Sequence, residues 1–153
     1  MLTIVFTVNG TPRPQPRPRF VKGHVVSTAD QGTRLWRAKV VSICAEVPRL
    51  PEKTPVSVEM VFRMPSAKAD RVNLPHLSTP DVDNLAKLIL DAMQDANMLP
   101  NDSAVSRLTV IKRWALPGDA GVSVQVSDDV PSGDGPQGPP KWLLGGVDPD
   151  DVE

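Results

Sequence analysis

The chain has a single cysteine, Cys44, and two histidines, His24 and His76, among its 153 residues. One cysteine excludes an internal disulfide and a cysteine-based zinc site, and two histidines far apart in sequence disfavour a histidine metal pair. No stretch approaches the roughly 20 apolar residues of a membrane span. The N-terminal segment carries no basic leader, so we expect a cytoplasmic protein without a membrane attachment. Cys44 falls within an expected helix, which favours a packed side chain over a nucleophile.

Charge is distributed unevenly along the chain, although the formal net charge is −1. Residues 127–153 hold seven acids and one base, which leaves 11 acids and 16 bases in residues 1–126. A basic body favours an anionic partner, and an acidic tail could mask that surface when no partner is present. The alternative is that the tail only keeps the protein soluble. We therefore expect one domain over residues 1–126 and a flexible, Pro/Gly-rich acidic tail over residues 127–153.

Hydrophobic periodicity predicts an α+β domain with a small mixed sheet of about four strands and two main helices. Strands are expected in four runs that are rich in branched residues or alternate in polarity, at residues 2–8, 55–64, 104–114 and 121–126. Helices are expected over residues 31–47 and 82–97. The predicted buried side of the first helix consists of Leu35, Ala38, Val41 and Ala45.

Two irregular segments are conspicuous. Residues 12–20 read PRPQPRPRF, and their four prolines exclude a helix and favour an extended, polyproline-like path. Residues 65–80 form a long loop, of a length typical of functional or disordered segments. A lone histidine in such a loop is expected to be solvated.

The first segment is also basic. Arg13, Arg17, Arg19 and the nearby Lys22 have few acids around them, and they are suited to phosphate contacts that position DNA without reading its sequence. The alternative is a basic, proline-stiffened surface loop that has no partner.

The densest group of informative side chains surrounds the second expected helix, in the string PDVDNLAKLILDAM. On a helical wheel Asp83, Lys87 and Asp91 share the polar side. Asp81 lies at or just before the N-terminus of this helix, and Asp102 comes from the loop that follows it. Helix capping by Asp81 and ordinary surface ion pairs of Lys87 are alternative explanations.

Metal binding is the stronger interpretation for the first two acids. Carboxylates as close as Asp81 and Asp83 repel each other unless a cation or a proton separates them. Mg²⁺ prefers oxygen ligands and often takes one or two carboxylates together with water and substrate phosphate. Lys87, one turn further on, fits a role at that phosphate as a point charge or in orienting water.

These pieces together resemble the RusA family of Holliday-junction resolvases. The matching parts are GTPRPQPRPRF, His76, PDVDNLAKLILDAM and Asn101-Asp102, which span roughly residues 9–113. The resemblance implies a RusA-like homodimer, typical of phages and prophages, that acts in DNA recombination and repair by cutting four-way junctions with Mg²⁺, with Mn²⁺ as a substitute.

The resemblance also implies roles for particular residues. It assigns the catalytic and metal-holding acids to Asp81, Asp83 and Asp102 and the catalytic lysine to Lys87. The sequence departs from the family pattern at Asn101, where relatives often have a second aspartate, and at Thr79, where a basic residue is common.

We therefore expect an endodeoxyribonuclease that resolves four-way DNA junctions by paired phosphodiester hydrolysis. One alternative is a catalytically inactive DNA-binding phage accessory protein of the same fold, against which the complete set of three acids and a lysine argues. Another is a metal-dependent enzyme acting on phosphate esters such as nucleotide-sugars, which leaves the basic segment unexplained.

The sequence leaves open whether Asp102 acts in its own chain or in the partner's. If the second helix ended near Asn97, a short return segment could not reach Asp81 and Asp83. We favour an end near Gln94 and a same-chain site, because Asn97, Pro100 and Asn101 are poor helix residues.

Overall fold

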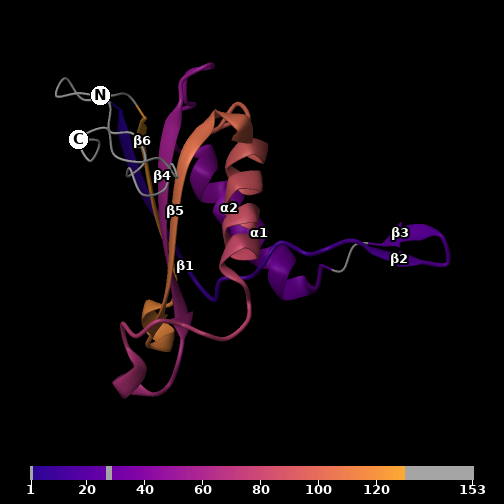
Figure 1. Ribbon diagram of the computed structural model, residues 1–153, viewed down its shortest axis with the longest axis vertical. Helices are drawn as coiled ribbons and strands as arrows, with labels where there is room; N and C mark the ends of the chain where they lie inside the picture. Colours follow the sequence, from indigo (N-terminus) through magenta and orange to yellow (C-terminus); the bar gives the residue numbers. More distant parts are fainter. Residues whose placement is uncertain (1, 27–28, 130–153) are drawn as a thin grey trace, which may run out of the picture.

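The computed structural model describes residues 2–26 and 29–129, and it shows a sheet with both long helices on one face (Figure 1). The sheet has four strands in the order β1-β6-β4-β5. The strands are β1 (Thr3–Asn9), β4 (Val56–Pro65), β5 (Val105–Ala115) and β6 (Gly121–Asp128). Strand β6 runs antiparallel to both neighbours, whereas β4 and β5 are parallel. The predicted α+β fold with a mixed sheet and two main helices is confirmed.

Strand β4 forms the centre of the core because it is paired on both sides and every second residue in it is buried. Val56, Val58, Met60 and Phe62 are at most 1% exposed and point toward the helices, together with the inward residues of β6. The apolar residues of α2 (Val82–Asp95) complete this core, and Leu85, Leu88 and Ile89 among them are fully buried. Burial of this apolar surface is the main force that holds the helices on the sheet.

Helix α1 (Gln31–Ala45) packs beside α2 and buries a different side from the one predicted. Its buried residues are Thr33, Trp36, Val40 and Cys44, while Leu35 is 63% exposed. The prediction was wrong because the sequence carries two apolar stripes one residue apart, and the helical wheel alone cannot choose between them. Trp36 decides the choice, because its large side chain gains most from burial against the sheet.

Cys44 lies on the buried side of α1 and has no exposed surface. Burial raises the pKa of its thiol to about 12, so the thiol stays protonated at neutral pH. Nucleophilic chemistry requires the thiolate. The interpretation of Cys44 as a packed side chain is thereby confirmed.

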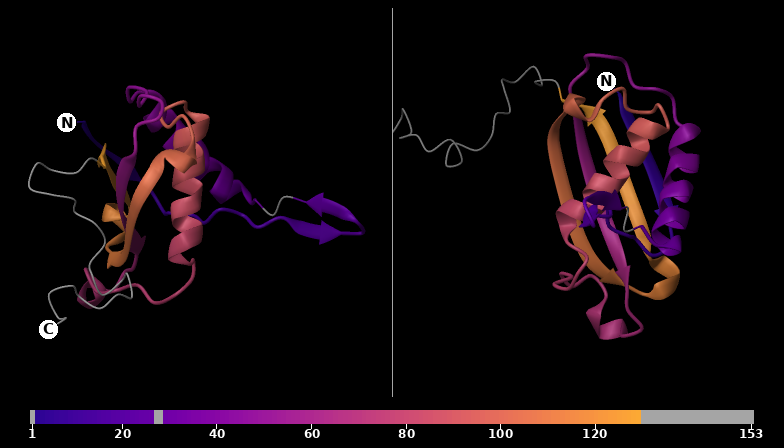
Figure 2. Two further views of the ribbon diagram at one scale, coloured as in Figure 1. Left: turned by 45° about the horizontal axis from the view of Figure 1, so that its top comes forward. Right: turned by 90° about the vertical axis from the view of Figure 1, so that its right-hand side faces the viewer.

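A short hairpin that the sequence analysis missed projects from the domain (Figures 1 and 2). Its strands are β2 (Arg19–Val21) and β3 (His24–Val26), and every residue in them is exposed. Lys22 and Gly23 connect the strands with φ angles of 50° and 80°, the pattern of a two-residue type I′ turn. The hairpin therefore carries Lys22, at its turn, away from the body on a twisted ribbon.

Strand β6 continues beyond the boundary expected at residue 126. Asp128 accepts a hydrogen bond from the Leu2 backbone N–H at 3.0 Å, and Asp129 accepts one from the Ser106 hydroxyl at 2.6 Å. The first two acids of the expected tail therefore contact the sheet, while residues 130–153 lie outside the described part of the chain.

Residues 2–26 and 29–129 also include three single-turn helices, η1 (Ala69–Arg71), η2 (Asp102–Ala104) and η3 (Pro117–Asp119). Within the described residues, no helix is both long and apolar enough to cross a membrane. The right-hand view in Figure 2 shows α1 and α2 lying across the sheet. In that arrangement the N-terminus of α2 lies at the same end of the domain as the loop that follows β4 (Figure 1).

Candidate active site

The N-terminus of α2 presents two aspartates to solvent. Asp81 is the N-cap residue, with an extended backbone, yet its side chain makes no capping hydrogen bond. Asp83 lies in the first turn, and both residues are exposed. Simple capping is therefore the wrong explanation for Asp81, and both carboxylates are available to a ligand at the electropositive end of the helix.

Lys112 of β5 holds the chain just before these acids. Its Nζ atom donates hydrogen bonds to the carbonyl oxygens of Ser78 at 2.7 Å and Pro80 at 2.8 Å. The Thr79–Pro80 peptide bond between them is cis. Sequence analysis missed this role, because no pattern distinguishes Lys112 from the other cations of β5.

Lys87 lies one turn after Asp83 and ion-pairs with two other acids. Its Nζ is 3.1 Å from Asp91 Oδ1 and 3.6 Å from Asp102 Oδ2. Asp91, and then Asp102, raise the pKa of Lys87, so its ammonium group remains charged throughout the neutral range. Because Lys87 is largely exposed, these pairs add little to stability.

Asp102 reaches Lys87 because α2 ends at Asp95, one residue after Gln94. The chain then reverses at Asn97, whose φ is 59°, and the Met98 and Leu99 N–H groups both donate to the Met93 carbonyl. The short return brings η2 back along the helix within the same chain. An early helix end of this kind is what a same-chain site requires.

The donor chemistry fits a hard divalent cation at the first two acids. Asp81 and Asp83 line one cavity of about 500 Å³, which Lys112 also lines, and two carboxylates with water and phosphate are a common Mg²⁺ environment. Asp102 is not among the residues lining that cavity. The described residues contain no group of three or more acidic, histidine or cysteine side chains placed to hold a metal. The three-ligand site that includes Asp102 remains a prediction.

A larger cleft of about 890 Å³ shares Asp81 with the acidic cavity, the cavity that Asp81 and Asp83 line. Arg13, Arg17 and Arg19 line it from the proline-arginine segment, and Asp81 lines both this cleft and the acidic cavity. Lys22 lies instead at the turn of the hairpin. The four predicted DNA-binding cations thus fall into two groups, and their contacts with DNA remain predictions.

Contacts with both helices fix this segment against the domain. The Gln15 N–H donates to the Asn84 carbonyl of α2 at 2.9 Å. Arg13 packs on the start of α1, where a Cβ atom at Gly32 would lie 3.0 Å from its Nη2, and its charge contributes to lowering the pKa of Asp30, after the hydrogen bonds from Thr33. Arg13 therefore has a structural role besides any phosphate contact.

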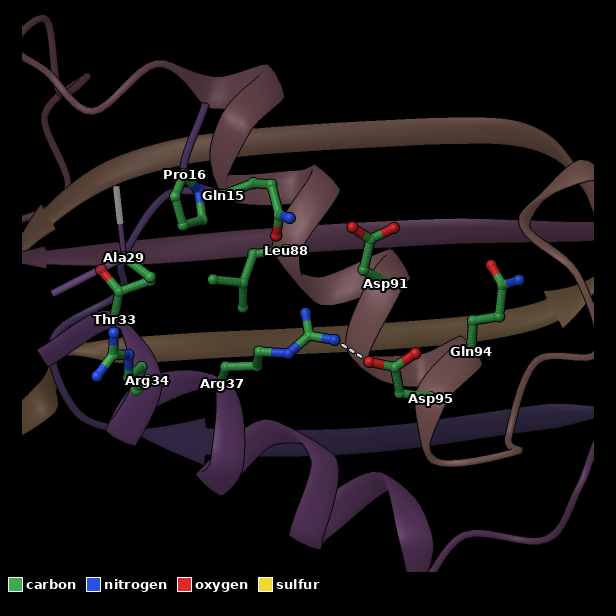
Figure 3. Close-up of a pocket in the computed structure, with 10 residues that line it drawn as sticks. All are labelled: Gln15, Pro16, Ala29, Thr33, Arg34, Arg37, Leu88, Asp91, Gln94 and Asp95. Carbon is green, nitrogen blue, oxygen red and sulfur yellow. Dashed lines mark hydrogen bonds and ion pairs between the residues drawn. The ribbon is translucent and has the colours of Figure 1, made fainter. Parts of the chain in front are cut away.

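Figure 3 shows a third cavity, of about 380 Å³, between the two helices. Gln15 extends into it beside Leu88, and Asp91 faces it from α2. Across the cavity Arg37 of α1 pairs with Asp95 at the end of α2. This ion pair joins the two helices that carry the site.

His76 differs from its prediction, because it is buried, with 7% of its surface exposed. Its ring lies against Trp114, with centroids 4.2 Å apart. The backbone N–H of His76 donates to the Lys112 carbonyl. The expectation of a solvated histidine was wrong because the residues that cover it belong to β5, far away in sequence. Trp36, which is 4% exposed, is a core residue, and Trp114 packs against the core while partly exposed.

A comparison with models of protein families agrees with this geometry. The model of the family described as endodeoxyribonuclease RusA matches residues 9–127, which include the arginine segment, α2 and Asp102. A comparison with curated proteins found no match. RusA enzymes are endodeoxyribonucleases, which hydrolyse phosphodiester bonds within DNA. Because the match covers most of the 153 residues, the chain belongs to the RusA endodeoxyribonuclease family.

Proposed function

We propose that this protein is a Mg²⁺-dependent resolvase that cuts four-way DNA junctions as a homodimer. The observation that carries the proposal is the position of Asp81, which lines both the acidic cavity and the arginine-lined cleft. A strand whose phosphates contact the arginines would pass directly over the acids. Binding and hydrolysis then occur on one continuous surface.

The cations of the proline-arginine segment hold the substrate. Arg17 and Arg19 contact phosphates and supply most of the affinity, in a way that salt weakens. Because the backbone N–H of Gln15 is hydrogen-bonded to the Asn84 carbonyl of α2, the segment keeps a fixed position relative to Asp81. The backbone is thereby oriented for attack, which is a major part of any rate acceleration.

Asp81 and Asp83 would hold the metal, and Lys87 would stand beside the phosphate. A bound Mg²⁺ supplies an activated water and neutralises charge on the phosphate. Lys87 stays protonated because of its acidic neighbours, so it offers a permanent positive charge to the anionic transition state. Asp102 keeps the Lys87 ammonium in position through their ion pair.

A junction has two strands to cut, whereas one chain carries one such site. Two copies related by a two-fold axis would match the symmetry of the junction and place one site at each of the opposed strands. The homodimer therefore follows from the requirement for paired cuts. Cleavage by a monomer would release a nicked junction instead of two duplexes.

The test is a cleavage assay on a synthetic four-way junction and on a linear duplex of the same sequence, with Mg²⁺ or with EDTA. We expect the junction to be cut in Mg²⁺, the duplex to be cut much more slowly, and EDTA to stop both reactions. Tight junction binding without cleavage in either Mg²⁺ or Mn²⁺ would identify an inactive accessory protein and refute the proposal.

A further inference from the structure

One face of the β2–β3 hairpin is purely apolar. Phe20 lies directly opposite Val25 in the pairing register, and opposite residues of an antiparallel pair share a face. Phe20 is 79% exposed and Val25 is 63% exposed. The hairpin stands clear of the sheet and of both long helices (Figure 1), so nothing in the described part of the chain covers this face. An aromatic ring held in water represents free energy that contact with a partner would recover.

The other face of the hairpin belongs to the arginine-lined cleft. Arg19 lines that cleft, and successive residues of a strand point to opposite faces. Phe20, the next residue, therefore points away from the cleft. DNA bound in the cleft would lie on the Arg19 side of the ribbon and leave the ring of Phe20 free on the other side.

The charge of the hairpin favours a nucleic acid as the partner of this ring. Residues 2–29 contain no aspartate or glutamate, and neither Arg19 nor Lys22 takes part in an ion pair with another described residue. Cations without acidic neighbours attract phosphates. A second copy of the chain is a poorer fit, because two apolar side chains cannot supply the roughly 800 Å² that each partner buries in a stable protein interface.

We infer that Phe20 stacks on a base pair exposed at the branch point of the DNA, with the hairpin inserted between two neighbouring arms. The inference rests on the proposed function, because it requires a branched substrate. An aromatic ring stacks on any base, whatever the sequence. Inside a continuous duplex each base pair is covered by its neighbours, whereas at a branch point the stack is interrupted. One arm would then contact the Arg19 side of the ribbon, and the end of the next arm would contact Phe20.

This arrangement makes Phe20 a determinant of substrate shape. Only branched DNA offers the ring a free base-pair face, and a base–aromatic stack corresponds to an affinity difference of about tenfold. Arg19 contacts phosphates, which junctions and linear duplexes share. Recognition of the branch and general affinity for DNA thus reside on opposite faces of one hairpin.

The test compares affinities for a four-way junction and for a linear duplex of the same sequence, by gel-shift titration in EDTA to prevent cleavage. We expect Phe20→Ala to lower the affinity for the junction by about tenfold and to leave the affinity for the duplex unchanged. Phe20→Tyr keeps the ring and should keep both affinities, whereas Arg19→Ala should lower both. Val5→Ala is the matched control, because Val5 is 64% exposed on β1, outside the hairpin.

A second measurement identifies what the ring touches. The photoreactive amino acid p-benzoylphenylalanine, placed at the position of Phe20, forms a covalent bond on irradiation to groups beside it. With a junction labelled on each strand in turn, we expect crosslinks to the nucleotides at the branch point. The matching linear duplex should give few crosslinks, because its base-pair faces are covered.

Several results would overturn the inference. They are an unchanged junction affinity in Phe20→Ala, an equal loss of affinity for junction and duplex, wild type with equal affinity for both, and crosslinks to a second protein chain instead of DNA. The last result would assign the apolar face to contact between two copies. Each of these leaves cleavage of junctions by the wild type intact. Folded wild-type protein that cuts no junction in Mg²⁺ would instead refute the proposed function, and the inference with it.

Discussion

The Nζ atom of Lys87 lies 3.6 Å from Oδ2 of Asp102 in the same chain. The contact ties the turn after α2 to the middle of the helix, one turn from Asp83. It is made without any contribution from a second copy of the chain. From this contact we predict that the acids and the lysine proposed for catalysis act together within one chain, even if two chains are needed for paired cuts.

We expect Asp83→Asn and Asp102→Asn each to be inactive alone, and mixing them distinguishes a same-chain site from a shared one. We expect heterodimers of Asp83→Asn and Asp102→Asn to remain inactive, because neither chain then keeps a complete set of acids. The measurement is nicking and resolution of a labelled four-way junction after subunit exchange. Restored nicking without full resolution would show that acids from both chains form one site.

Exchange must be demonstrated separately. Wild type mixed with Asp83→Asn serves as the control, because its heterodimers keep one intact site and should nick the junction. Loss of resolved product with a gain of nicked product in that mixture confirms that subunits have exchanged. If subunits have exchanged, absence of nicking in the mixture of Asp83→Asn with Asp102→Asn supports a same-chain site.

Removal of single carboxylates should separate cleavage from binding. We expect Asp81→Asn and Asp83→Asn to lower the cleavage rate more than a hundredfold, an effect of the size that follows from loss of a few kcal/mol of transition-state stabilisation. Junction affinity should stay the same or rise, since a negative charge near the phosphates has been removed. Gel-shift titration and single-turnover cleavage measure the two quantities.

Glu59→Gln is the matched control for this pair. Glu59 is an exposed acid on β4, and it alternates with Val58 and Met60, which face the helices. The substitution removes the same charge on the other face of the sheet and should leave both quantities unchanged. Lost binding in the folded Asp81 and Asp83 variants would show that these acids do not act mainly in catalysis.

The arginine segment should dominate the salt dependence of binding. Each lost phosphate contact reduces the slope of log affinity against log salt by about one unit, so Arg17→Ala with Arg19→Ala should reduce it by about two. Arg49→Ala is the control, because Arg49 contacts Glu52 and Asn97 beyond the far end of α2. An unchanged slope in the double variant would move the DNA surface elsewhere.

Lys112 should act as a positioning residue for Asp81. Lys112→Met leaves the carbonyls of Ser78 and Pro80 without their donor, and we expect cleavage to fall by about tenfold, in line with the loss of charged hydrogen bonds. Lys112→Arg should recover much of the rate, because it keeps a cationic donor. Arg113→Met, a change at the adjacent cation, should have a smaller effect.

A full rate in Lys112→Met would show that the loop keeps its shape without these bonds. Thermal melting of each variant is needed beside the rate, because a general loss of stability would also lower cleavage. Recovery by arginine separates the two explanations.

Much of the fold was predictable because its elements have strong local patterns. Strand β4 alternates in polarity over most of its length, and the apolar side of α2 is continuous, so both were predicted close to their observed bounds. The β2–β3 hairpin was missed because all its side chains are exposed. Alternation between buried and exposed residues, the usual signal of a strand, is absent there.

The site was predictable only in part, because some of its contacts join residues that are distant in sequence. Asp81, Asp83 and Lys87 lie on one short helical segment, so sequence spacing alone places them together. The burial of His76 and the hydrogen bonds of Lys112 depend on β5 meeting a loop that is distant in sequence. Such long-range contacts leave no local pattern to detect.

The most direct measurement of the central claim is the product that the enzyme makes from a supercoiled plasmid carrying an extruded cruciform, which is a four-way junction. With Mg²⁺ we expect linear plasmid, because two opposed strands are cut before the complex dissociates, and we expect Asp83→Asn to leave the plasmid supercoiled. A product that stays nicked and circular, or linear product that forms equally fast on a plasmid without the cruciform, would contradict paired cleavage of a junction.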